Sequence, residues 1–132
     1  MYREIDRFDE AEALIERALE IDKALYGEDH PFVAVDISHL AQVYRDADRF
    51  EEAEPLFERA IEISENSYGK EHPDVADTLN HLAKLYEATD RVKDAETLYR
   101  RALKILEARM GPDHPDTKEV RENLEVLLKN MQ

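Results

Sequence analysis

A six-residue stretch returns twice at a fixed spacing, and this return limits the folds that the chain can adopt. Tyr26–Pro31 reads Tyr-Gly-Glu-Asp-His-Pro, Tyr68–Pro73 reads Tyr-Gly-Lys-Glu-His-Pro, and Met110–Pro115 reads Met-Gly-Pro-Asp-His-Pro. Each copy begins 42 residues after the previous one. A constant period of this length is typical of repeat proteins, in which each repeat is one supersecondary unit stacked on its neighbours. We therefore expect a repeat array.

The segments between these links have the periodicity of amphipathic helices. Apolar residues recur three and four positions apart, as an α-helix with one buried face requires. Glycine in each link is expected to end the preceding helix, and proline is expected to stand in the first turn of the next one. The predicted helices run from Asp6 to about Leu25, begin near Pro31, Phe50, Pro73 and Val92, and end with one from about Pro115 to Asn130. The fold class predicted from this pattern is all-α with about six helices in antiparallel pairs.

An aspartate and a histidine recur before predicted helices, where they are expected to hydrogen-bond the free N–H groups of the first turn. Asp6, Asp48 and Asp90 each stand just before a helix, where a short acceptor side chain can cap free N–H groups. His30, His72 and His114 each precede the proline of a link. Copies in stacked repeats lie on the order of 10 Å apart, too far to share a metal ion. We therefore interpret these histidines as residues that hydrogen-bond the start of the following helix.

The 42-residue period also predicts how the chain divides. Met1–Asp6 aligns with Val43–Asp48, so we expect it to be the tail of a preceding helix and the N-terminus to be cut within a repeat. In the last helix Arg121 and Glu125 replace apolar or small residues of the earlier copy, which is typical of an end cap. The expected organisation is one array, with a partial repeat at 1–26, repeats at 27–68 and 69–110, and a capping helix at 111–132.

Charge and composition narrow the class of partner. The net charge is −14, and residues 1–68 carry seven Lys and Arg against nineteen Asp and Glu, a net −12. Nucleic acid and anionic membranes would be repelled. No apolar run is long enough for a membrane span or a secretory signal, which indicates a soluble chain. The absence of Cys excludes thiol chemistry and slightly favours a reducing, cytoplasmic compartment. No phosphate loop, zinc-binding pair or nucleophile motif is present, so we expect no enzyme activity, cofactor or metal.

Two short motifs resemble those of a known family. Leu-Ala-x-x-Tyr occurs at Leu40–Tyr44 and Leu82–Tyr86, and Ala-Glu-x-Leu-(Phe/Tyr)-x-Arg-Ala occurs at Ala53–Ala60 and Ala95–Ala102. With the Gly-x-x-His-Pro-x-Val-Ala link, the chain resembles tetratricopeptide repeats of the 42-residue kinesin-light-chain type over its whole length. One departure is that aspartate replaces the glycine that the family often has before the second helix. Aspartate can occupy that turn at a cost of about 1 kcal/mol if the turn must be left-handed.

The resemblance implies a right-handed α-solenoid whose concave groove, lined by the first helix of each pair, binds a peptide or partner segment. The polar residues that it places in the groove are Ser38, His39, Gln42, Arg45, Asn80, His81, Lys84, Glu87, Glu122 and Asn123. Asparagines can hydrogen-bond a peptide backbone, and the many carboxylates around Arg45 and Lys84 favour a mixed or partly basic partner. A solvated helix face is the alternative for each of these residues.

Two further hypotheses remain open. The first helix carries Ala13, Leu14 and Leu25 on an apolar strip that could support a homodimer or exchange of terminal helices, and Ala13 and Leu25 have no apolar counterpart in the later copies. The chain could also be a regulatory fragment of a larger signalling protein.

Overall fold

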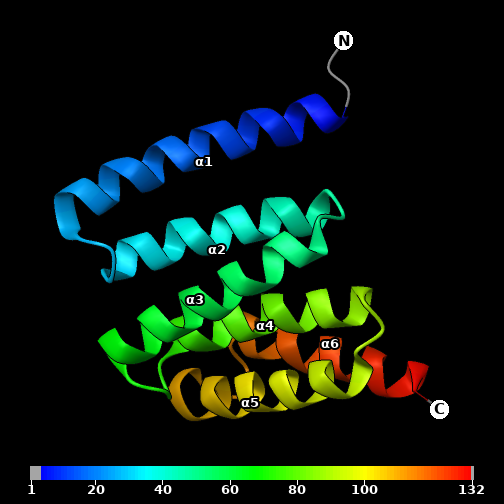
Figure 1. Ribbon diagram of the computed structural model, residues 1–132. Coiled ribbons are helices and arrows are strands. Elements are labelled where there is room, and N and C mark those ends of the chain that lie inside the picture. The colour runs from blue at the N-terminus through cyan, green and yellow to red at the C-terminus, as the bar shows by residue number, and fades with distance from the viewer. Residues whose placement is uncertain (1–3, 132) are drawn as a thin grey trace. The chain divides into compact units, whose positions relative to one another are not determined.

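Six α-helices make up the part of the chain that the structure describes. This computed structural model describes residues 4–131, with side chains from residue 7 onward. No strand occurs within this range, so the predicted all-α class is confirmed. The helices, shown in Figure 1, are α1 (Glu4–Tyr26), α2 (Pro31–Asp46), α3 (Phe50–Tyr68), α4 (Pro73–Ala88), α5 (Val92–Met110) and α6 (Pro115–Asn130).

The helices form two compact units. Unit 1 ends at Ser67 and contains α1, α2 and all of α3 except its last residue, and unit 2 begins at Tyr68 and contains α4 to α6. Within each unit, consecutive helices run in opposite directions and are joined by short turns (Figure 1). Short connections of this kind make sequence neighbours pack as antiparallel pairs.

Small and large apolar side chains alternate in the core of each unit. In unit 1, Val33, Ala34 and Ile37 of α2 pack with Ala60 and Ile63 of α3, and Leu19 and Leu56 lie at the edge of this cluster. In unit 2, Leu79 and Leu85 of α4 and Tyr99 and Ile105 of α5 are fully buried. Alanine between large residues lets helix axes approach closely and the side chains interlock.

The three links have the geometry that the sequence predicts. Gly27, Gly69 and Gly111 have φ of 91°, 90° and 89°, a region that other residues rarely adopt. In each link the histidine is the N-cap, and its Nδ1 accepts a hydrogen bond of 3.1 Å from the N–H two residues later. Proline follows as the first helical residue. The interpretation of these histidines as helix-start residues is confirmed.

The prediction that the three aspartates are N-caps is wrong. Asp48 and Asp90 have φ of 62° and 65°, and the residue before α5 is Arg91, which makes no side-chain cap bond. Each aspartate instead follows the preceding helix in a left-handed turn, and the next N–H donates back to Tyr44 or Tyr86 O at 2.8 Å. This is the position where helices usually have glycine, and a non-glycine residue there costs about 1 kcal/mol.

The expected helix tail at the N-terminus is also corrected in part. Glu4–Asp6 continues directly into α1, so Asp6 lies inside that helix and not in front of it. The remainder of the predicted tail, residues 1–3, lies outside the described residues. In the later copies, the left-handed turn at Asp48 or Asp90 is closed by a hydrogen bond to the carbonyl of Tyr44 or Tyr86 in the preceding helix. No helix is described before α1 that could close such a turn.

Candidate functional site

Two asparagines meet across α4 and α6 in unit 2. The Asn123 amide on α6 donates to the Asn80 side-chain oxygen on α4, with Nδ2 and Oδ1 3.0 Å apart. Asn80 is 3 % exposed, whereas Asn123 is half-buried at the edge. This bond uses one N–H of Asn123 and leaves its carbonyl and second N–H for another partner. The structure therefore brings two of the predicted site residues together.

Ionisable side chains of α4 and α6 lie near this amide pair. Lys84 Nζ lies 3.7 Å from Glu119 Oε1, and His81 Nε2 lies 3.9 Å from Asp77 Oδ1. A small cavity opens beside Asn80, and its lining combines carboxylates with apolar side chains. It is lined by Pro73, Asp77, Asn80, Leu106, Asp116, Glu119 and Val120. The face formed by α4 and α6 thus presents amides, one lysine and several carboxylates around a partly apolar hollow.

Glu87 and Glu122, the two predicted acidic site residues of unit 2, have different surroundings. The Glu87 carboxylate accepts a hydrogen bond from the Tyr99 hydroxyl, which ties it to α5. Glu122 is exposed on α6 and belongs to no ion pair among those identified in residues 7–131. Glu87 is therefore partly used in holding α4 to α5, while Glu122 stands in solvent.

The predicted site residues of unit 1 lie along α2. The Gln42 amide donates to Ser38 Oγ at 3.4 Å, and Ser38 is buried. Arg45 is half-buried, with its guanidinium 3.5 Å from Asp46 and 5.8 Å from the centre of the Phe57 ring. His39 is exposed. Of the four residues, His39 is the most accessible.

Comparison with known proteins supplies the family. The family model described as tetratricopeptide repeat matches residues 1–50 and 35–108. The chain belongs to the tetratricopeptide repeat family. Its all-α repeat fold and its kinesin-light-chain type of repeat follow from this match and from the solved structures below. No curated protein sequence matches the chain.

Solved tetratricopeptide structures have the same fold. BtubC (BKLC) from P. vanneervenii is 30 % identical with a TM-score of 0.84, over 93 % of this chain and 49 % of that one. A putative kinesin light chain of Podosopora anserina with nearly identical TPR-like repeats is 24 % identical with a TM-score of 0.80, over 94 % of this chain and 59 % of that one. This chain therefore spans about half the length of the solved relatives it matches.

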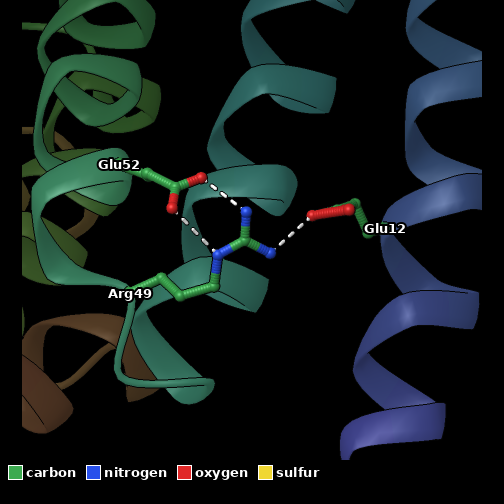
Figure 2. Close-up of polar contacts among 3 residues, drawn as sticks. All are labelled: Glu12, Arg49 and Glu52. Carbon is green, nitrogen blue, oxygen red and sulfur yellow. Dashed lines mark hydrogen bonds and ion pairs between the residues drawn. The ribbon is translucent and has the colours of Figure 1, made fainter.

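Arg49 joins α1 to the start of α3 within unit 1, in a cluster of contacts not predicted from the sequence. Arg49, in the turn before α3, bonds Glu52 at 2.5 Å and Glu12 of α1 at 2.9 Å, as Figure 2 shows. Its guanidinium carbon lies 4.3 Å from the centre of the Tyr44 ring, and Arg91 repeats this stack on Tyr86 at 4.0 Å. The recurrence of Asp-Arg at 6–7, 48–49 and 90–91 was the signal for this cluster.

Titration in this cluster follows from the contacts. The hydrogen bonds and charge of Glu52 raise the pKa of Arg49 above its usual range, and those of Arg49 lower the pKa of Glu52. Burial and then the hydrogen bond with Glu12 raise the pKa of Tyr44 to about 12. The cluster therefore keeps its ion pairs and a protonated Tyr44 hydroxyl at neutral pH.

A second missed feature is a pair of aspartates between α1 and α2. Burial, followed by the hydrogen bond with Asp22 and the charge of that carboxylate, raises the pKa of Asp36 to about 7. Asp36 Oδ2 is buried without a hydrogen-bond partner. In the copy between α5 and α6, Leu106 and Val120 occupy the same repeat positions and are buried. An acidic pair thus stands where a later copy has an apolar contact.

Part of the α1 surface is apolar and exposed, as expected. Leu14 is 66 % exposed and Leu25 is 68 % exposed, and Ala13 is exposed beside them. Ile21 is 52 % exposed as well. These side chains lie away from the part of α1 that carries Glu12 and Leu19.

The described residues contain neither a metal-binding cluster nor a membrane-spanning helix. Within residues 4–131, no group of three His, Cys, Asp or Glu side chains is placed to hold a metal ion. No helix in this range has the length and apolar character to cross a membrane.

Proposed function

We propose that this tetratricopeptide chain is a non-catalytic scaffold, in the cytoplasm, that binds a peptide segment of a partner protein on the α4–α6 face of unit 2. The proposal rests on the hydrogen bond between Asn80 and Asn123, since amides fixed across two helices can pair with the backbone of an extended peptide. Tetratricopeptide arrays are generally protein-interaction scaffolds, and repeat arrays offer extended binding surfaces. In unit 1, His39, Gln42 and Arg45 occupy the corresponding helix, α2, and are proposed as further contacts.

The charges on this face indicate a mixed or partly basic peptide. Asp77, Asp116 and Glu119 line the cavity, and Lys84 already lies beside Glu119. Carboxylates in excess of cations attract a basic segment and repel an acidic one, mainly through the association rate. We expect affinity to fall as salt rises, because these carboxylates are largely exposed.

A peptide-display selection against the whole chain, followed by calorimetry of the selected peptide, tests the proposal. Asn123→Ala and Lys84→Ala should each weaken binding about 5- to 30-fold, equivalent to about 1–2 kcal/mol for a lost hydrogen bond or charge contact. Lys104→Ala, an exposed lysine on α5, is the matched control and should bind as the parent does. Equal affinities for all three variants would place the peptide elsewhere and contradict the proposed site.

The exposed strip of α1 supports a second candidate function, self-association. Leu14 and Leu25 expose about two thirds of their surface, and apolar side chains that cluster at a surface favour contact with another protein. Light scattering over a wide concentration range separates the two candidates, because peptide binding at α4–α6 does not depend on the oligomeric state of α1.

A further inference from the structure

The apolar strip on α1 has the spacing of a coiled-coil seam. Leu14, Ala18, Ile21 and Leu25 follow one another at intervals of four, three and four residues. Apolar residues at alternating three- and four-residue spacing form the a and d positions through which two helices pack. Three of the four are more than half exposed, and Ala18 lies half-buried at the border. We refer to these four residues as the α1 seam.

The same residue types are buried against a helix elsewhere in unit 1. In α3, the positions that correspond to Leu14, Ala18 and Ile21 are Leu56, Ala60 and Ile63. Ala60 and Ile63 pack on the Val33, Ala34 and Ile37 cluster of α2, with Leu56 at its edge. The structure itself therefore shows that this set of side chains buries well against an antiparallel helix.

The seam extends one turn further than the repeat pattern requires. Leu25 corresponds to Ser67 in α3 and Arg109 in α5, which are both exposed and polar. Stacking of one tetratricopeptide repeat on another does not account for a leucine at this position. A partner that reaches the last turn of α1 does account for it.

We propose that the partner is α1 of a second copy, packed antiparallel about a two-fold axis, which specifies the surface for the self-association candidate above. In this register Leu14 lies against Leu25 of the second copy, and Ala18 lies against Ile21 of the second copy. Each pairing occurs twice because a two-fold contact uses the same patch on both chains. Small Ala against large Ile fills the central layers without overlap.

Charges beside the seam are compatible with this register. Arg17, which flanks the seam on its outer side, faces Ala24 of the second copy and meets no cation. The net −12 of residues 1–68 nevertheless repels an identical half, so association should strengthen as salt is added.

An end-to-end chain of copies fits less well than a closed pair. Such a chain would place α6 of one copy on the α1 seam of the next. The α6 positions that correspond to Val33, Ala34 and Ile37 are Thr117, Lys118 and Arg121. Packing Lys118 and Arg121 onto leucines would desolvate two charged side chains, and among the described residues only Arg121 has an ion-pair partner, Glu107 at 3.6 Å. The two-fold pair buries the seam and leaves no open end.

Sedimentation equilibrium of the whole chain from micromolar to millimolar concentration tests the proposal. The parent should form a dimer, tighter at 0.5 M than at 0.05 M salt, and Leu14→Glu or Leu25→Glu should weaken it at least about 100-fold. Val126→Glu, an exposed valine on α6, is the control and should dimerise as the parent does. A monomeric parent, or a dimer that Leu14→Glu leaves intact, would overturn the proposal.

Disulfide trapping tests the orientation, since the chain has no cysteine of its own. An oxidised mixture of a Leu14→Cys chain and a Leu25→Cys chain should give the mixed dimer, whereas each chain alone should give little. Efficient trapping of Leu14→Cys with itself would contradict the antiparallel register. All three seam leucine and isoleucine positions are exposed, so melting temperatures close to that of the parent should accompany each variant. Loss of dimerisation would leave peptide binding by α4 and α6 unchanged, so the two proposals fail separately.

Discussion

Replacing Thr117 by valine should stabilise the protein. Thr117, in the first turn of α6, is fully buried, and its hydroxyl oxygen has no hydrogen-bond partner. The corresponding residues of the two earlier copies are Val33 and Val75, both fully buried as well. Valine has the shape of threonine without the hydroxyl, and both are β-branched with similar helix propensity. The substitution therefore removes one buried polar group and changes little else.

The size of the effect follows from the cost of the unpaired hydroxyl. A buried hydroxyl without a partner costs about 1–3 kcal/mol by protein mutational data. We expect Thr117→Val to raise the free energy of unfolding by about 1–2 kcal/mol, since some relaxation around the site occurs in the parent. For a chain of this size each kcal/mol corresponds to about 3–5 °C in Tm. Urea unfolding should show a higher midpoint with an unchanged slope.

Thr78→Val is the matched control. Thr78 lies in α4, is 6 % exposed, and its hydroxyl donates to the Asp74 carbonyl oxygen at 3.2 Å. The same atoms are exchanged, but here a hydrogen bond is lost, so stability should stay level or fall by up to about 1 kcal/mol. A Thr117→Val protein no more stable than the parent, or an equal gain for both variants, would refute the reasoning from the unpaired hydroxyl.

Three further predictions concern charged and capping groups. The pKa of Asp36 is raised to about 7 from 3.8, so the folded state keeps a proton that the unfolded state releases above about pH 4, and stability falls as pH rises from 4 to 7. The Asp36→Asn variant should therefore have a free energy of unfolding about 1–2 kcal/mol above that of the parent at pH 8, and nearly the same as the parent at pH 4. This figure is well below the free energy that corresponds to the whole pKa shift, because the side chain is partly exposed. Equal gains at both pH values in urea titrations would contradict this. His72→Ala should cost about 0.5–2 kcal/mol through loss of the bond to the Asp74 N–H, and His72→Asn should recover most of it because asparagine is a strong N-cap; thermal melts that rank the two variants alike would argue against capping. Arg49→Ala should bring the pKa of Glu52 back up, as followed by NMR titration. The same variant should speed hydrogen exchange in α1 relative to an Arg109→Ala control, because the bond from Arg49 to Glu12 is lost. Unchanged exchange would show that this bond does not stabilise α1.

The sequence predicts the links of this fold well because their causes are local. Glycine with φ near 90° and proline in the first helical turn act through their own backbone, and His72 caps an N–H two residues away. Such effects do not depend on distant parts of the chain. The period of 42 residues then transfers each conclusion to the other copies.

Features that join distant segments were not predictable in the same way. Glu12 and Arg49 are 37 residues apart in the sequence, and their contact depends on how α1 packs on α2 and on the turn before α3. The Asp22–Asp36 pair likewise arises from helix packing, not from spacing. For Asp48 and Asp90 the sequence shows that they precede a helix, but not the sign of φ that decides between an N-cap and a left-handed turn. Among the predicted site residues, burial of Ser38 and Asn80 is set by neighbouring helices and by the Asn123 contact.

The histidine caps have a spectroscopic consequence. A ring that accepts through Nδ1 carries its single hydrogen on Nε2 when neutral, so His30, His72 and His114 are all fixed as the same tautomer. Imidazole nitrogen shifts distinguish this form from its alternative and from a ring that exchanges between both. Each link therefore contains one histidine whose ring nitrogen signals report on that link alone. Loss of the cap in one link would shift the signals of its histidine and leave those of the other two unchanged.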